Sequence, residues 1–141
     1  MNKKIINSSV TEGFKSKLEK RAYELFITAG FNVQYEPEKY ILWKGDTVDI
    51  KTVRFKKGDI AIKNKHTLRD ITYTPDFKVE YNNKIYIIET KGFRNDVFPL
   101  KYKLYLSLLS SFLNAHEFVY VEPCNISDIK IVITKIKNNE I

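Results

Sequence analysis

Two acidic residues and a lysine are the groups in this chain whose types and spacing could do chemistry. Asp76 follows Pro75 at one apolar run, and Glu89 and Lys91 end the next apolar run. Carboxylates are ligands that Mg²⁺ accepts, and a lysine ammonium can offset negative charge on a phosphate. Brought together on a small sheet, these three groups could hold a divalent cation beside a phosphate.

The dipeptide between the two runs, Asn82-Asn83, predicts how these groups are aligned. Asparagine tolerates the positive φ that a two-residue hairpin turn requires. With this turn, Asp76 lies directly opposite Glu89, at a Cβ separation of roughly 4.5–5.5 Å and on the same face. Side chains alternate along a strand, so Lys91 shares that face. A bulge would shift the register by one residue.

Two opposed carboxylates destabilise a sheet unless something neutralises them. A bound Mg²⁺ would do so, and Lys91 as a structural salt-bridge partner is the alternative. A third acid, Glu19, has apolar residues at i+3, i+4 and i+7 on a predicted helix. A glutamate on an apolar face needs a partner, so we expect Glu19 to reach the Asp76–Glu89 face, although most helical glutamates are merely solvated.

Hydrophobic periodicity predicts the elements that must position these groups. The first elements are a helix over 11–29, ended by Gly30, and strands over 31–35 and 40–43. An irregular hairpin over 46–70, with its turn at Lys57-Gly58-Asp59, is followed by a hairpin that pairs 71–79 with 84–91. A helix over 98–112 and a strand over 117–121 come next. Residues 128–135 could be a strand or a short helix, and the alternation of Ile129, Ile131 and Ile133 favours a strand. The order predicts an α/β class, with a single domain over 1–141 built on a central mixed sheet flanked by helices.

Composition narrows the class of protein. The chain has 141 residues, of which 43% are hydrophobic, and this suits one globular domain. Cys124 is the single cysteine, which excludes an intrachain disulfide and a multi-cysteine zinc site, and we expect it to be a small buried residue. His66 and His116 lack metal-ligand spacing. No apolar run approaches the ~20 residues of a membrane span, and the first residues do not resemble a signal peptide, so the expected location is the cytoplasm and no membrane partner is expected.

The net charge of +7 is concentrated in one segment. Seven lysines and arginines between positions 51 and 69 are opposed by a single acid, Asp59. A basic surface attracts polyanions and releases counterions when it binds them. The charge therefore suggests nucleic acid as a partner, and a solvated, solubilising loop is the alternative.

The residues also resemble a known family. Pro75-Asp76 followed by Glu89-Thr90-Lys91 resembles the core motif of the PD-(D/E)XK nuclease superfamily. Phe14-Lys15-Ser16-Lys17-Leu18-Glu19 resembles the F-x-S-x-L-E first-helix signature of phage endonuclease I-type Holliday-junction resolvases. In that family Tyr-x-Pro-Asp-Phe and Glu-Thr-Lys-Gly follow in the same order, as residues 73–77 and 89–92 do here. Residues 91–103 are also similar to small phage endonuclease-like proteins, and the whole similarity covers roughly residues 11–109.

This resemblance implies a restriction-endonuclease-like fold and an endodeoxyribonuclease that depends on Mg²⁺, for which Mn²⁺ can substitute. Glu19, Asp76 and Glu89, with the Thr90 carbonyl, would hold the metal, and Lys91 would complete the catalytic set. The implied substrate is branched DNA such as a Holliday junction, and the implied location is the host cytoplasm if the protein is phage-encoded. Paired cuts need two active sites, which implies a homodimer.

From the basic charge and the resemblance together, we expect these residues to contact DNA: Lys15, Lys56, Lys57, Lys63, Lys65, Arg69, Arg94, Lys101 and Lys103. Segment 46–70 is longer than the corresponding link in the endonuclease I pattern, which leaves open whether the intertwined dimer of that family is kept. Two other functions also stay open. One is an endonuclease for flaps, nicked DNA or duplex, and the other is a DNA-binding module that has lost its chemistry.

Overall fold

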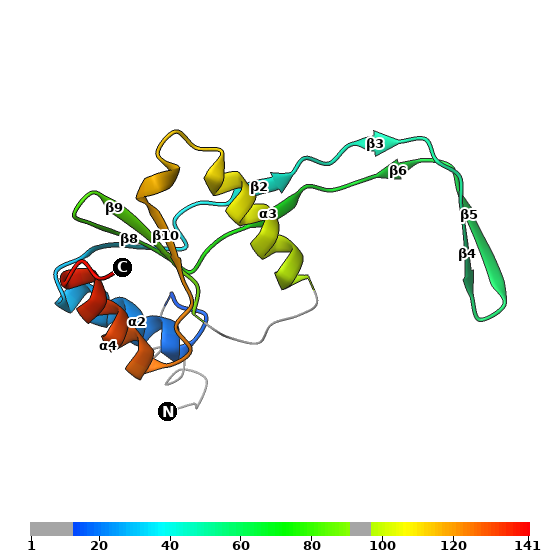
Figure 1. Cartoon of the computed structure of the whole chain (residues 1–141). Coiled ribbons are helices and arrows are strands. Elements are labelled where there is room, and N and C mark those ends of the chain that lie inside the picture. The colour runs from blue at the N-terminus through cyan, green and yellow to red at the C-terminus, as the bar shows by residue number, and fades with distance from the viewer. Residues whose placement is uncertain (1–12, 91–96) are drawn as a thin grey trace, which may run out of the picture.

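A four-stranded sheet forms the centre of the protein (Figure 1), in a computed structural model that describes residues 13–90 and 97–141. Its strands, in spatial order, are β1 (Asn32–Tyr35), β8 (Phe77–Tyr81), β9 (Lys84–Ile88) and β10 (Phe118–Val121). The first three pair antiparallel, whereas β10 runs parallel to β9. The sheet is therefore mixed, and the predicted α/β class is confirmed.

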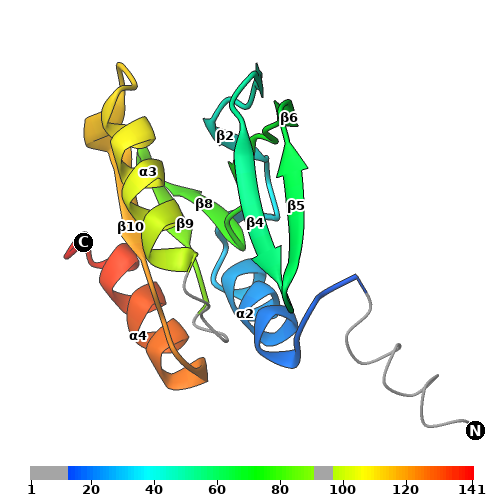
Figure 2. The same ribbon diagram turned by 90° about the vertical axis from the view of Figure 1, so that its right-hand side faces the viewer.

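Helices cover both faces of this sheet. Helices α2 (Lys17–Thr28) and α4 (Ile126–Lys137) pack on one face, where Phe77 belongs to the core. Helix α3 (Phe98–Ser110) packs on the opposite face against Ile87. Figures 1 and 2 show α2 and α4 side by side, with α3 across the sheet from them. Strand alternation decides which face each side chain meets.

Local signals explain where α2 begins and ends. Ser16 is its N-cap, and the Ser16 Oγ accepts the backbone N–H of Glu19 at 3.1 Å. Gly30, just beyond the helix, takes a φ of +84°, which glycine adopts without strain. The helix predicted over 11–29 thus begins at Lys17 in the part of the chain that the structure describes; positions 11 and 12 lie outside it.

The strand favoured over 128–135 is wrong and the alternative, a helix, is confirmed, because this segment belongs to α4. Asn125 caps this helix, since its Oδ1 accepts the N–H of Asp128 at 2.9 Å. Ile129, Val132 and Ile136 repeat at helical spacing and are buried. Ile131, which supported the alternating pattern, is 54% exposed.

The strand predicted over 71–79 is divided in two by Pro75. Strand β7 (Ile71–Tyr73) pairs with β2 (Tyr40–Trp43), whereas β8 pairs with β1 and β9 in the central sheet. Proline lacks the N–H that a continuous strand needs, so the chain changes partners at this point.

Residues 44–70 form a long antiparallel excursion, which we call the arm; it extends away from the sheet and helices (Figure 1). Strands β3 (Thr47–Val48) and β6 (His66–Thr67) pair along it, and β4 (Thr52–Lys56) and β5 (Asp59–Lys63) form the hairpin at its end. The predicted turn at Lys57-Gly58 is confirmed. At the base of the arm, Gly45 lies so close to Leu68 that a Cβ there would collide with the Leu68 carbonyl oxygen.

Three smaller expectations have mixed outcomes. Cys124 is exposed rather than buried, because it lies in the connection just before α4. His66 is half-buried, and its Nε2 lies 2.9 Å from the Ile50 carbonyl oxygen, whereas His116 is exposed. Among residues 13–90 and 97–141, no helix is both long and apolar enough to cross a membrane. A short 3-10 helix, Ala115–Glu117, leads into β10.

Candidate active site

The β8–β9 hairpin has the register that its turn predicts. Asn82 and Asn83 have φ values of +47° and +62°, as a two-residue turn requires. Pairing runs along the whole hairpin and ends at Phe77 opposite Ile88. Asp76 comes one position before Phe77, and Glu89 comes one position after Ile88. The register therefore places the two acids side by side at one end of the sheet.

The carboxylate of Asp76 is fixed by Thr90. Its Oδ2 accepts the Thr90 backbone N–H at 2.8 Å and the Thr90 hydroxyl at 2.5 Å. Burial raises the pKa of Asp76, and these two hydrogen bonds oppose the rise. Thr90 itself is buried. Thr90 therefore acts through its backbone amide and its hydroxyl, which orient the carboxylate of Asp76.

The carboxylate of Glu89 is held by Tyr73. The Tyr73 hydroxyl donates to Glu89 Oε2 at 2.6 Å, and the Glu89 backbone N–H donates to the Val121 carbonyl at 3.0 Å. Burial, and then the negative charge of Asp76, raise the pKa of Glu89 to about 7. The Tyr73 hydroxyl and the Asp76 backbone N–H partly counteract this rise. Two adjacent acids therefore both resist ionisation, which is the electrostatic condition that a cation relieves.

Strand β10 adds further polar groups beside Glu89. The Tyr120 hydroxyl interacts with Tyr73 and with the carboxylate of Glu122. Glu122 follows β10 as Glu89 follows β9, and its charge contributes to the raised pKa of Glu89. The end of the sheet at which both strands finish is consequently acidic.

Glu19 is buried, as predicted, but its carboxylate has local partners. Glu19 Oε2 accepts the Tyr35 hydroxyl at 2.8 Å and the Lys15 backbone N–H at 3.1 Å. The second contact satisfies a backbone donor just before α2, as a capping glutamate does. The negative charge of Glu19 also contributes to the raised pKa of Asp76.

Glu19 lies on α2, which packs on the face of the central sheet that contains Phe77, whereas Tyr73, the donor to Glu89, belongs to the core on the face of Ile87 and α3. In the described residues, no group of three or more His, Cys, Asp or Glu side chains is arranged to hold a metal ion. The structure thus pairs Asp76 with Glu89 and does not bring Glu19 into one group with them.

The two carboxylates of this pair suit Mg²⁺ better than they suit a metal ion whose ligands all come from the protein. Mg²⁺ is usually held by one or two carboxylates, while waters and substrate phosphates supply the other ligands. Asp76 and Glu89 are two neighbouring, half-buried carboxylates whose ionisation is unfavourable without a cation. Both observations fit a site that is completed by the substrate.

The basic residues predicted to contact DNA lie in three places. Lys15 is exposed beside the acids, forms an ion pair with Glu36 and has a raised pKa, owing mainly to that partner. Lys101 and Lys103 lie on α3, half-buried and exposed respectively. The arm carries five more, all exposed: Lys56, Lys57, Lys63, Lys65 and Arg69. Lys91 and Arg94 lie outside the described residues, so their predicted roles stay predictions.

Two tyrosines at the site had no role in the sequence-based prediction. Tyr73 lies within the motif around Pro75, yet only the fold shows that its hydroxyl reaches Glu89. Tyr35 follows Val33 at strand alternation on the face that α2 covers, which is a signal that it meets this helix. Its partner on the helix, Glu19, cannot be read from either segment alone.

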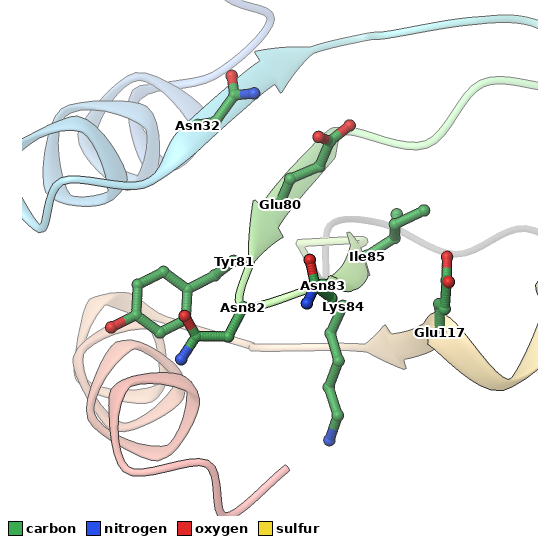
Figure 3. A pocket seen from close by; sticks show the side chains of 8 residues that line it. All are labelled: Asn32, Glu80, Tyr81, Asn82, Asn83, Lys84, Ile85 and Glu117. Atoms are coloured by element: carbon green, nitrogen blue, oxygen red, sulfur yellow. The ribbon is translucent and has the colours of Figure 1, made fainter.

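A separate hollow of about 490 Å³ lies at the other end of the β8–β9 hairpin (Figure 3). Asn82, Asn83 and Glu117 are among the residues that line it. Lys84 also lines this hollow. Glu89 lies five residues further along the chain, roughly 17 Å away at the usual rise per strand residue. The hollow is therefore distinct from the acid pair.

The chain matches no protein-family model, and searches of curated proteins and of solved structures find no similar chain. The case for a function consequently depends on the residues and on their geometry.

Proposed function

We propose that this protein is a Mg²⁺-dependent endodeoxyribonuclease that hydrolyses phosphodiester bonds in branched DNA, with the four-way Holliday junction as its substrate. The observation that carries the proposal is the Asp76–Glu89 pair. These two half-buried acids are adjacent in register, each held by a neutral hydroxyl donor, and both have raised pKa values. A structural role alone gives no reason to keep two such acids together at the end of a sheet.

Each protein group has a defined part in this proposal. Asp76 and Glu89 hold Mg²⁺, while Thr90 and Tyr73 fix the orientation of the two carboxylates. When bound, Mg²⁺ polarises the scissile phosphate and lowers the pKa of a coordinated water. Lys91, two residues after Glu89, is proposed to orient or deprotonate the attacking water. Lys15, beside the acids, offers a cation to a neighbouring phosphate.

A homodimer follows from the substrate. Resolving a junction requires two paired cuts, and each chain carries one Asp76–Glu89 pair, so two copies are needed. The arm, with its excess of basic residues, provides the electrostatic attraction for DNA.

A cleavage panel tests the proposal. The purified chain is incubated with Mg²⁺ and, at equal concentrations, a four-way junction, a flap, a nicked duplex, a linear duplex and a single strand. We expect the junction to be cut fastest, and Asp76→Asn and Glu89→Gln to abolish cutting while junction binding is retained. Glu80→Gln is the matched control, because Glu80 lies on the same hairpin but toward its far end, where it pairs with Ile85.

The outcomes separate the alternatives. Plain duplex cut at the junction's rate would refute the junction specificity but keep the nuclease. Undiminished cutting by either acid variant would remove the site assignment. No cutting of any substrate, with binding retained, would favour a non-catalytic DNA-binding module.

A further inference from the structure

The hairpin at the end of the arm has one wholly apolar face, which no other part of residues 13–90 and 97–141 covers. Val53 pairs with Ile62 and Phe55 pairs with Ile60, so alternation places all four side chains on the same face. The exposed fractions are 47% for Val53, 59% for Ile62, 73% for Phe55 and 60% for Ile60. Figure 1 shows this hairpin standing clear of the sheet and helices. An uncovered apolar cluster of this kind marks an interaction surface.

The charges of the hairpin lie on its other face. Lys56 pairs with Asp59, Lys63 pairs with Thr52, and Arg54 pairs with Ala61. DNA bound to the arm gains from these cations, whereas the apolar face offers it neither a cation nor a hydrogen-bond donor. The distribution of charge therefore assigns the two faces to different partners, and the partner of the apolar face is itself apolar.

We infer that this partner is the same hairpin face of a second copy of the chain, an inference that rests on the homodimer of the proposed function. An apolar face without charge is self-complementary, which a two-fold symmetric interface requires. Two such ribbons stack about 10 Å apart, and their basic faces are then directed outward and away from each other. Four side chains per copy bury roughly 900 Å² in total, which is below the roughly 1,200–2,000 Å² of stable specific interfaces and predicts a weak and concentration-dependent dimer.

This arrangement couples assembly to DNA. Stacked hairpins present a basic surface on each side, so one branched molecule can engage both copies at once. Two copies held on one DNA molecule face each other at a high effective concentration, and a weak contact then becomes sufficient. Branched DNA is accordingly expected to promote the dimer.

Chemical crosslinking tests which face is buried between copies. In the full chain with Cys124→Ser, to remove the exposed native thiol, Ile62→Cys is compared with Ala61→Cys. These neighbours lie on opposite faces of β5. A short bismaleimide should join two copies through position 62 at least tenfold more efficiently than through position 61. Equal crosslinking at both positions would overturn the inference.

Sedimentation equilibrium without DNA or metal tests the energetics. The wild-type chain should dimerise within the micromolar range, and Phe55→Ser should weaken the dimer at least tenfold. Ala61→Ser, on the opposite face, should leave it unchanged. Hydrogen exchange of the β4 and β5 amides shows whether the hairpin is still formed in Phe55→Ser. If it is not formed, the comparison of Ile62→Cys with Ala61→Cys tests the interface instead.

Three further results would each contradict the inference. They are a wild-type chain that stays monomeric at several hundred micromolar, a dimer that Phe55→Ser does not weaken, and DNA that shields position 62 from maleimide while the protein remains monomeric. The last would assign the apolar face to nucleic acid. None of these measurements involves cleavage, so a dimer without nuclease activity would refute the proposed function and leave the interface standing.

Discussion

At the scale of single residues, the candidate site consists of two acids kept in place by uncharged donors. Tyr73 and Thr90 fix the carboxylates of Glu89 and Asp76 without neutralising them. A salt bridge would have cancelled the charge that a cation needs, whereas a hydroxyl orients the oxygen and leaves the ligand able to bind. The choice of partner therefore favours cation binding over structural pairing.

Tyr73→Phe tests this positioning role. The variant loses the donor to Glu89, and since that donor lowers the pKa of Glu89, the acid becomes harder to ionise. We expect the rate at neutral pH to fall about tenfold, and the acidic limb of the pH–rate profile to move to higher pH. Tyr81→Phe, at the other end of the hairpin, is the control. A rate loss without movement of that limb would indicate a merely structural tyrosine.

Glu89→Gln tests the electrostatic cost of the site in the metal-free protein. Below the ordinary pKa of 4.5 the acid is protonated in both folded and unfolded chains and costs nothing. As the pH rises, Glu89 releases its proton in the unfolded chain first, so the free energy of unfolding decreases. The decrease ends at about pH 7, the pKa of Glu89 in the folded protein. The uncharged variant avoids this loss, and at pH 8 its free energy of unfolding should be higher by up to about 3 kcal/mol.

Urea denaturation in EDTA between pH 4 and 8 measures the effect. Glu80→Gln, whose side chain is 47% exposed, should follow the wild-type pH dependence. A Glu89→Gln chain with no gain at pH 8 would show that Glu89 ionises freely in the folded protein.

At the scale of elements, the features that could be predicted from the sequence are those that neighbouring residues determine. The register of β8 and β9 could be predicted because the Asn82-Asn83 turn sets it locally. The pairing of β7 with β2 could not, since it joins segments about thirty residues apart around the arm. Pro75 was a visible signal for the break between β7 and β8, but not for the new partner.

The error at α4 and the position of Glu19 have a common cause. Alternating isoleucines fit a strand, and the same residues also supply a helical stripe in which Ile129 and Ile136 are buried. Only packing against α2 decides between the two patterns. In the same way, the apolar surroundings of Glu19 could be read from the sequence, but the face of the sheet that α2 would cover could not.

Asn125→Ala tests the capping of α4. Loss of the side-chain acceptor leaves the Asp128 N–H without its cap partner, and the free energy of unfolding should fall by about 1 kcal/mol. Asn125→Asp retains an acceptor and serves as the control, with stability close to wild type. An unchanged Asn125→Ala chain in urea denaturation would show that this cap does not stabilise the helix.

At the scale of the whole molecule, the acid pair is separated from the basic residues of the arm. The acid pair lies at one end of the central sheet, whereas most of the predicted DNA contacts lie on the arm. Binding and chemistry should therefore respond to different substitutions. Attraction by the arm is sequence-independent and sensitive to salt.

Replacing Lys56, Lys57 and Lys63 by alanine tests this separation. The slope of log affinity against log salt concentration should become shallower by roughly 0.9 for each phosphate that the variant no longer neutralises. The same number of alanines at Lys130, Lys135 and Lys137 on α4 gives the matched change in net charge and should leave the slope unchanged. Equal effects of the two triple variants, measured by fluorescence anisotropy on a junction, would indicate net charge rather than direct binding by the arm.

The way the arm joins the body has a consequence for how such a protein can diversify. Both ends of the arm are clamped by the pairing of Trp43 with Ile71, so they remain adjacent whatever lies between them. Doubling the length of a closed loop costs only about 0.6 kcal/mol. Insertions and deletions in the arm are thus nearly neutral for the stability of the body. Natural selection can lengthen, shorten or recharge the arm, and so change reach and partner, while the acid pair is inherited unaltered.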